Sequence, residues 1–285
     1  MTRIALFGGN GYLGTQLAAY YAAQGVMCDV FDMPSFDVTQ VNRWDSFRAT
    51  DYSAILFFAG MTGTEKSFTD AGRFLDVNEH GLLNLLIRLA PLGSNAPKVI
   101  FPSSRLVYKG ADQPLTEDAS KETKTVYAVN KLACEYLLQA YHVRYGISYA
   151  VLRICVPYGN IVSANYSYGT VGFFLKQAEA GGPITLYGDG CLRRTFTHVS
   201  DICLAVEKLI SSNAIGIFNV GGQDMSLLDA AKIVAEKKHV GISFVPWPSD
   251  ALALESGSTV FDSGRLESVT GWRMTKSFLD FAEEI

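Results

Sequence analysis

Short apolar runs alternate with longer helical stretches through the first half of the chain. The apolar runs predict strands at residues 4–7, 27–31, 54–58, 98–101 and 148–154. The stretches between them predict helices at residues 12–24, 41–49, 71–90 and 126–145. Strands that alternate with helices indicate βαβ units, so this half predicts an α/β fold with a doubly wound parallel sheet of the Rossmann type.

The alternation becomes irregular after Ile154, which predicts a smaller α+β lobe. Residues 156–167 are expected to form a loop because they include Pro157, Gly159, Asn160 and Asn165. Helices are expected at residues 168–180, 200–211, 227–238 and 277–284, with short strands at 184–187, 195–197 and 216–220. The main domain is then formed by residues 1–155 and 199–222, and the smaller lobe by residues 156–198 and 223–285.

A glycine-rich turn follows the first strand and leads into the first helix. Gly8, Gly11 and Gly14 have the spacing GxxGxxG, and backbone N–H groups at a helix N-terminus bind pyrophosphate when no side chain blocks the approach. A tight turn without a ligand is the simpler alternative. Asp32, however, ends the second strand 18 residues after Gly14, where an acid can accept hydrogen bonds from ribose hydroxyls. The sequence therefore predicts that the main domain binds a dinucleotide.

Asp32 also bears on which dinucleotide is bound. Its carboxylate would repel the 2′-phosphate of NADP. No Arg or Lys lies between Asp32 and Asp37 to bind that phosphate. NAD is therefore the expected cofactor, and NADP is the less favoured alternative.

Composition restricts the other classes of partner. The net charge is −4 and the longest basic cluster is Arg193-Arg194, so nucleic acid is not an expected partner. Residues 4–7 are too short an apolar run for a signal peptide, and no run of about 18 apolar residues predicts a membrane span. We therefore expect a cytoplasmic protein. The five cysteines and four histidines lack metal-ligand spacing, which favours buried thiols and no metal site.

A serine, a tyrosine and a lysine are placed where they can act together. Ser104 follows the strand at 98–101, and Tyr127 and Lys131 share one face at the start of a predicted helix. An exposed tyrosine–lysine pair is the simpler alternative. Lys131 and a positively charged nicotinamide would lower the pKa of Tyr127, and Ser104 could bind the same substrate oxygen. This arrangement moves a proton on or off a carbinol while hydride moves to or from a cofactor.

The chain resembles the extended short-chain dehydrogenase/reductases, in particular the nucleotide-sugar epimerases and dehydratases similar to UDP-galactose 4-epimerase. The resemblance is carried by the glycine turn, Phe58-Ala59-Gly60, Ser103-Ser104, Tyr127 and Lys131, and the segment from Gly188 to Asp201. It implies a catalytic set formed by Ser104, Tyr127 and Lys131, and a substrate site that includes Ser104 and Arg194, which would bind the substrate pyrophosphate. It implies that NAD contacts Gly8, Gly11, Tyr12, Leu13, Gly14, Asp32, Asp37, Val38, Phe58, Ala59, Gly60, Asn78, Tyr127 and Lys131.

Two departures from the family pattern concern the reaction. Dehydratases of the family carry an Asp-Glu pair directly after this position, whereas Ser104 is followed by Arg105 and Leu106, so dehydration is not expected. Val156 stands where the epimerases usually have an asparagine that contacts substrate phosphate. This second departure, together with the short length of the chain, favours a reductase.

Three functions therefore remain open. The first is an NAD-dependent epimerase acting at C4 of a nucleotide-linked hexose, because Asp32 favours NAD that is recycled within each turnover. The second is a reductase of a nucleotide-4-keto sugar. The third is an NAD(P)-binding sensor without catalysis, but such proteins tend to lack the tyrosine and lysine. The predicted helices at 71–90 and 126–145 are also candidates for the interface of a homodimer.

Overall fold

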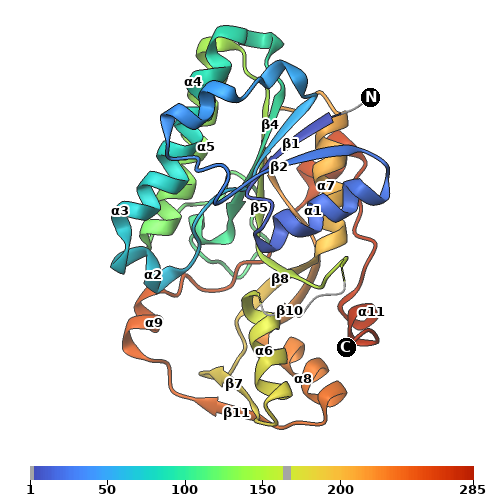
Figure 1. Cartoon of the computed structure of the whole chain (residues 1–285). Helices are drawn as coiled ribbons and strands as arrows, with labels where there is room; N and C mark the ends of the chain where they lie inside the picture. Colours follow the sequence, from blue (N-terminus) through green and yellow to red (C-terminus); the bar gives the residue numbers. More distant parts are fainter. Residues whose placement is uncertain (1–2, 163–167) are drawn as a thin grey trace.

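The computed structural model describes residues 3–162 and 168–285, and its centre is a parallel sheet (Figure 1). The strand order is β2-β1-β3-β4-β5-β9, and neighbouring strands are parallel throughout. The strands are β1 (Arg3–Phe7), β2 (Met27–Phe31), β3 (Ala54–Phe57), β4 (Lys98–Ser104), β5 (Tyr149–Ile154) and β9 (Gly216–Asn219). The predicted α/β fold with a doubly wound sheet is confirmed.

Helices cover both faces of this sheet because its strands are apolar on both sides. Ile4 and Leu6 of β1 pack in one core with α1 (Tyr12–Ala23) and α7 (Val199–Ser211). Ala5 and Phe7 point the other way, into a second core beneath α4 (Gly81–Leu89) and α5 (Val126–Tyr145). Figure 1 shows these two helical layers on opposite sides of the strands.

The second half adds a smaller group of elements with a core of its own, in the lower part of Figure 1. One sheet has the order β10-β8-β6 and a second pairs β11 with β7. These strands are β6 (Val156–Tyr158), β7 (Ile184–Tyr187), β8 (Arg193–His198), β10 (Gln223–Ser226) and β11 (Ile242–Val245). The helices are α6 (Gly169–Glu179), α8 (Leu227–Lys238), α9 (Ser249–Leu254) and α11 (Phe278–Ala282). Another helix of this half, α10 (Gly264–Thr270), packs instead against α7 and β9 of the central sheet. The domain boundaries given above stay a prediction.

Local structure differs from the prediction at the start of the second half. The loop expected at 156–167 begins with a strand, β6, which tolerates Pro157 because it lies at the edge of its sheet; residues 163–167 lie outside the described residues. The helix expected at 71–90 is present as one continuous helical run, made of α3 (Ala71–Phe74), a π-helical segment Leu75–His80 and α4. The helix α2 (Thr64–Thr69) was not predicted because its sequence has no apolar repeat.

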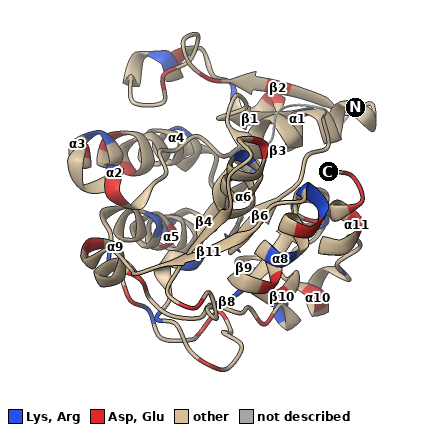
Figure 2. Ribbon diagram, turned by 90° about the horizontal axis from the view of Figure 1, so that it is seen from below, with Lys and Arg blue, Asp and Glu red and all other residues tan. Residues whose placement is uncertain are grey.

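The surface carries both signs of charge. Figure 2 shows basic and acidic positions interspersed on the helices. Within residues 3–162 and 168–285, no helix is long and apolar enough to cross a membrane, and no group of three or more His, Cys, Asp or Glu side chains could hold a metal ion. Cys134, Cys155 and Cys203 are buried as expected, whereas Cys191 is exposed.

Candidate active site

A cleft runs along the carboxyl ends of the central strands, where α/β sheets bind ligands. One end is lined by residues that follow β1, β2 and β3, and the middle by residues of the glycine turn, β4 and α5. The far end is lined by residues that follow β4 and by parts of β6 and α6. The predicted residues along the first two parts are Gly8, Gly11, Tyr12, Leu13, Gly14, Asp32, Asp37, Val38, Phe58, Ala59, Gly60, Ser104, Tyr127 and Lys131.

The glycine turn has no room for side chains where it touches its neighbours. Gly8 has a φ of +86°, and a Cβ there would lie 2.4 Å from the backbone nitrogen of Ala59. A Cβ on Gly14 would lie 2.1 Å from the carbonyl oxygen of Gly8. Gly11 is the N-cap residue of α1 and no described side chain caps this end of the helix. The first N–H groups of α1 therefore remain available to an anion in the cleft.

Asp32 lies at the end of the cleft beside β2. Its Oδ2 accepts a hydrogen bond from Asn10 N at 2.7 Å, and its Oδ1 accepts one from Met33 N at 2.7 Å. A carboxylate held in this way keeps lone pairs for two further donors, such as ribose hydroxyls. Arg73 of α3 lines the same end of the cleft, and sequence reasoning missed it because it considered only the residues that follow Asp32.

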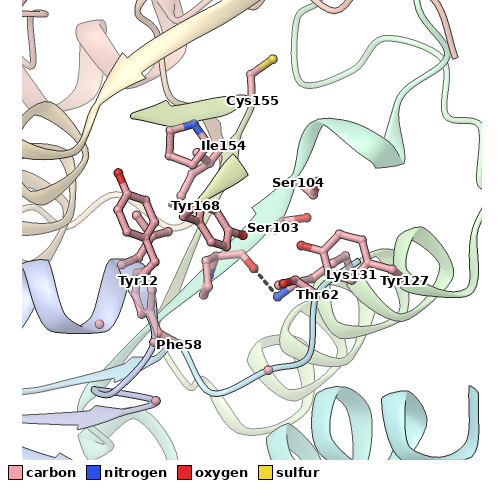
Figure 3. A pocket seen from close by; sticks show the side chains of 17 residues that line it. Tyr12, Phe58, Thr62, Ser103, Ser104, Tyr127, Lys131, Ile154, Cys155 and Tyr168 are labelled. Atoms are coloured by element: carbon pink, nitrogen blue, oxygen red, sulfur yellow. Dashed lines mark hydrogen bonds between the residues drawn. The ribbon is translucent and has the colours of Figure 1, made fainter. Parts of the chain in front are cut away.

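Ser104, Tyr127 and Lys131 meet in the middle of the cleft. Thr125 caps α5 by accepting a hydrogen bond from Ala128 N at 3.0 Å, which fixes the turn that carries Tyr127. Ser104 ends β4, and its Oγ accepts a hydrogen bond from Leu106 N at 3.2 Å, so its own hydrogen is free to be donated. Lys131 is buried, and its Nζ donates to the carbonyl of Pro102 at 2.8 Å. Figure 3 shows the three side chains on one wall of the pocket, opposite Tyr12.

Burial dominates the protonation of this group. It raises the pKa of Tyr127 well above the ordinary value, Tyr168 adds to the rise, and a hydrogen bond with Ser104 lowers the pKa by less. Burial therefore prevails in the chain that the structure describes, and Tyr127 is a phenol at neutral pH. The predicted lowering of its pKa by Lys131 together with a bound nicotinamide stays a prediction. Burial lowers the pKa of Lys131 to about 8, so at pH 7 this side chain is mostly an ammonium.

This buried ammonium makes stability depend on pH in a predictable direction. Folded Lys131 releases its proton near pH 8, whereas the unfolded chain releases it near 10.5. Between these values the unfolded chain binds more protons, so the contribution of Lys131 to stability rises with pH. The free energy of unfolding of the parent is thus expected to rise by about 3 kcal/mol relative to that of Lys131→Met between pH 7 and pH 10.5. Urea unfolding of both proteins at the two pH values measures this change.

The matched control for this measurement is Lys176→Met, which removes an exposed ammonium from α6. Its free energy of unfolding should differ from that of the parent by the same amount at both pH values. If the difference in the free energy of unfolding between Lys131→Met and the parent is also the same at both pH values, the pKa of Lys131 is not lowered.

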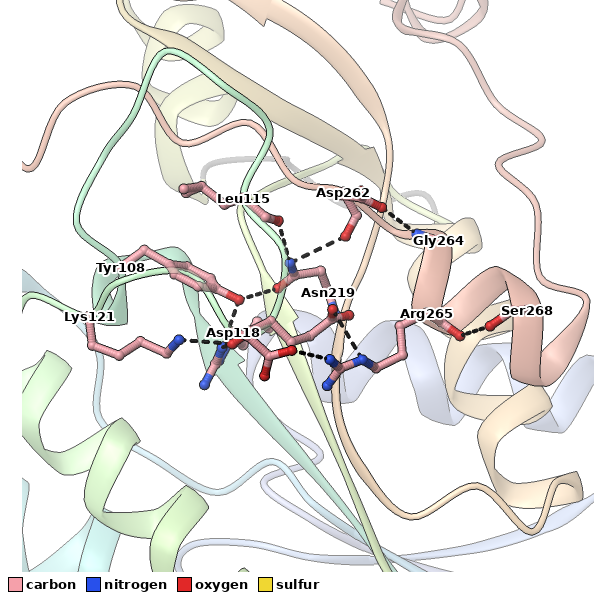
Figure 4. A network of polar contacts seen from close by, with 11 residues as sticks. Tyr108, Leu115, Asp118, Lys121, Asn219, Asp262, Gly264, Arg265 and Ser268 are labelled. Atoms are coloured by element: carbon pink, nitrogen blue, oxygen red, sulfur yellow. Dashed lines mark hydrogen bonds and ion pairs between the residues drawn. The ribbon is translucent and has the colours of Figure 1, made fainter.

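A buried polar network lies behind this wall and fixes β4, β5 and α5 to one another. Arg153 of β5 pairs with Glu135 of α5 at 2.5 Å, and Ser103 Oγ donates to Glu135 at 2.5 Å. Arg153 also donates to the hydroxyl of Tyr108 at 2.7 Å. That hydroxyl in turn donates to Asn219 at 2.7 Å, as Figure 4 shows. Any movement that separates these partners would leave a buried charge unpaired, which costs free energy. The network therefore holds the end of β4, which carries Ser104, in one position.

Two predicted site residues lie outside the cleft lining. Asn78 is buried and binds the backbone of Met61, to which its Nδ2 donates at 3.1 Å and from which its Oδ1 accepts at 2.7 Å. Arg194 is only 2% exposed and pairs with Glu255 at 2.8 Å. Its Nη1 donates to the carbonyl of Gly257 at 2.7 Å. The predicted contacts of Asn78 with cofactor and of Arg194 with substrate stay predictions.

Sequence reasoning also missed an aromatic pair at the mouth of the pocket. The rings of Tyr12 and Tyr168 stack with centroids 4.6 Å apart, and the Tyr12 hydroxyl donates to Gly159 at 2.6 Å. These contacts join the start of α1 to the residues that follow β6. Tyr12 was identified only as part of the glycine turn, and Tyr168 had no motif around it because its partner is distant in sequence.

Three features of the cleft fit a dinucleotide. The turn at Gly8 and Gly14 excludes side chains, the first turn of α1 is uncapped by any described side chain, and Asp32 stands at the expected end. These features define a dinucleotide-binding α/β protein of the Rossmann class. The chain belongs to the NAD dependent epimerase/dehydratase family, whose characteristic sequence matches residues 4–221.

Its relatives in that family have different named activities. The chain is 29% identical over 194 residues to a UDP-glucuronate 4-epimerase of Thermodesulfobacterium geofontis, which covers 67% of this chain and 58% of that protein. It is 25% identical over 282 residues to a GDP-6-deoxy-D-mannose reductase of Pseudomonas aeruginosa, which covers 95% of this chain and 91% of that protein. These relatives do not fix one reaction for this chain.

Solved structures share the fold. A dTDP-glucose 4,6-dehydratase from Streptomyces venezuelae with NAD and TYD bound has a TM-score of 0.87 and 21% identity, over 99% of this chain and 95% of that chain. A UDP-glucose 4-epimerase of Thermus thermophilus in complex with NAD has a TM-score of 0.85 and 23% identity, over 99% of this chain and 96% of that one. The cofactor of the family is NAD, and an NADPH complex occurs among the similar structures.

Proposed function

We propose that this chain is an NAD-dependent nucleotide-sugar epimerase that acts at C4 of the sugar. The observation that carries the proposal is the position of Ser104, Tyr127 and Lys131, which share one wall where the dinucleotide part of the cleft meets its far end. The chemistry that NAD supplies when bound is reversible hydride transfer with C4. The far end is then the place for the sugar.

The residues of this chain handle the proton at the C4 oxygen. Tyr127, a phenol at neutral pH, donates its proton to a C4 carbonyl oxygen as that oxygen gains negative charge. Ser104 Oγ can donate to the same oxygen and hold it in place. The oxidative direction needs Tyr127 as the phenolate: in that form it takes the proton of the C4 hydroxyl and becomes the phenol that returns the proton in the reductive direction. The ammonium of Lys131, with its Nζ 5.8 Å from the centre of the Tyr127 ring, and the positive charge of a bound nicotinamide would stabilise that phenolate.

A reductase of a nucleotide-4-keto sugar is the second candidate, and one feature favours it. Val156 lines the far end of the cleft, where it offers no polar atom to a substrate phosphate. The reductase relative also matches nearly the whole of this chain. The same three residues would serve this reaction in its reductive direction alone.

The dinucleotide that the purified protein carries separates these two candidates. An epimerase regenerates its cofactor in each turnover, so denaturing the protein should release NAD in nearly equal amount to the chain. Such a result is followed by a screen of UDP-, GDP-, CDP- and dTDP-sugars for epimerisation. A protein that releases none and binds NADH or NADPH from solution contradicts the epimerase and directs the screen to 4-keto sugars. Arg73, which lines the cleft near Asp32, is a residue type that accommodates a 2′-phosphate, so NADPH belongs in this test.

We also propose that the chain forms a homodimer through α4 and α5. Apolar side chains on these helices are exposed, among them Ile87 at 53%, Tyr136 at 60% and Val143 at 79%. Burying such a surface against a second copy is favourable. Light scattering at micromolar concentration should give twice the mass of one chain, and the mass of one chain contradicts the dimer.

A further inference from the structure

Arg105 is a charged residue in the cleft that the proposed mechanism does not use. It follows Ser104 directly and begins the short turn Arg105–Val107. Its Nη1 is buried and has no hydrogen-bond partner within residues 3–162 and 168–285. A buried donor without a partner costs free energy, so its retention needs an explanation.

The charge of Arg105 is also uncompensated. Arg194 is close enough for the charge of Arg105 to help lower its pKa, but Arg194 is paired with Glu255 at 2.8 Å. Arg105 forms no ion pair within the part of the chain that the structure describes. Two guanidinium groups and one carboxylate leave a net positive charge beside the cleft, which favours an anion from outside the chain.

The place of Arg105 limits which anion this is. It lines the far end of the cleft with Ser104, Tyr127 and Val156. Adjacent Cα atoms are about 3.8 Å apart, so Arg105 starts beside the residue that contacts the C4 oxygen. The substituents next to C4 on a hexose are those of C3 and C5, and the anion that a sugar can carry there is a carboxylate at C6.

We propose that Arg105 binds a carboxylate on the substrate sugar, so that the substrate is a nucleotide-linked hexuronate rather than a neutral hexose. The assignment rests on the function proposed above. A guanidinium binds a carboxylate with two parallel hydrogen bonds, which would use the free Nη1 and neutralise the charge. The substrate diphosphate is the other anion that could meet Arg105, and the experiment distinguishes the two.

Calorimetric binding to the NAD-loaded protein tests this assignment, with Tyr127→Phe present in every protein compared, the parent included, so that the sugar nucleotide is not turned over. The tightest of UDP, GDP, CDP and dTDP first fixes the base, and the glucose and glucuronate forms of that nucleotide are then compared. We expect the parent to prefer the glucuronate form. Arg105→Gln should weaken its binding roughly 10- to 100-fold and leave the glucose form and the free nucleotide unchanged. Arg105→Lys should lose less, because it keeps the charge.

The matched control is Lys109→Gln, which removes the same charge from an exposed neighbouring position. It should leave the affinities for the glucuronate form, the glucose form and the free nucleotide unchanged. An equal loss for all three ligands in Arg105→Gln assigns the residue to the diphosphate and overturns the proposal, as does no loss at all. A parent that binds both sugar nucleotides equally also overturns it but leaves the proposed function standing. If neither binds, the proposed function fails as well.

Discussion

Replacing Tyr127 by Phe is expected to lower kcat by about 10²- to 10⁴-fold, the usual contribution of a positioned acid or base. The variant loses one hydroxyl, whose hydrogen bond is with Ser104. The ring remains packed in the first turn of α5, so the fold and the binding of NAD should be retained. Turnover of the sugar nucleotide and the affinity for NAD, measured on the same sample, separate a loss of proton transfer from a loss of structure.

The matched control is Tyr136→Phe, which removes a hydroxyl from the same helix at a position that is 60% exposed. Its kcat should equal that of the parent. Normal turnover by Tyr127→Phe contradicts both the epimerase and the reductase, because both need a proton at the C4 oxygen. A protein that binds NAD and never turns over a sugar nucleotide, with or without Tyr127, is instead the sensor.

Replacing Gly14 by Ala is expected to weaken NAD binding by at least tenfold, or about 1.4 kcal/mol. A Cβ at this position would lie 2.1 Å from the carbonyl oxygen of Gly8 and 2.8 Å from the Cα of Gly9. Both atoms belong to the backbone, so the turn must move. The N–H groups of α1 then no longer lie against the pyrophosphate in the same way.

Gly72→Ala is the control for this change, since a Cβ on Gly72 of α3 would meet no atom within 4 Å. Its affinity for NAD, measured by titration calorimetry, should match that of the parent. A Gly14→Ala variant that binds NAD as tightly as the parent shows that the turn does not support the cofactor. That result would also remove the basis for placing the dinucleotide beside Gly8.

The sheet and the dinucleotide end of the cleft could be predicted because their signals are local in sequence. The central strands are short, mostly apolar runs, and Gly8, Gly11 and Gly14 lead from the end of the first strand into the first turn of its helix. Asp32 lies near the glycine turn because β1 and β2 are parallel neighbours, so that the residues after both strands meet at the same edge of the sheet. In these cases the spacing along the chain fixes the spacing in the fold.

The parts that could not be predicted depend on contacts between distant residues. The stack of Tyr12 on Tyr168 and the pair of Arg153 with Glu135 join segments whose separation no periodic pattern encodes. The pairing of the buried Arg194 with Glu255 likewise had no signal in the residues around it in the sequence. The burial of Tyr127, which raises the pKa of its hydroxyl, also has no sequence signal.

We propose that this chain inverts C4 of a nucleotide-linked sugar by removing hydrogen from that carbon and returning it. The fate of a deuterium label at C4 is the most direct measurement of that process. The substrate is the sugar nucleotide that the protein binds tightest, labelled with deuterium at C4, and the product is analysed by NMR. We expect an epimer inverted at C4 that keeps the deuterium there, with none lost to water. An unchanged sugar, or an epimer whose C4 carries hydrogen from solvent, contradicts this proposal.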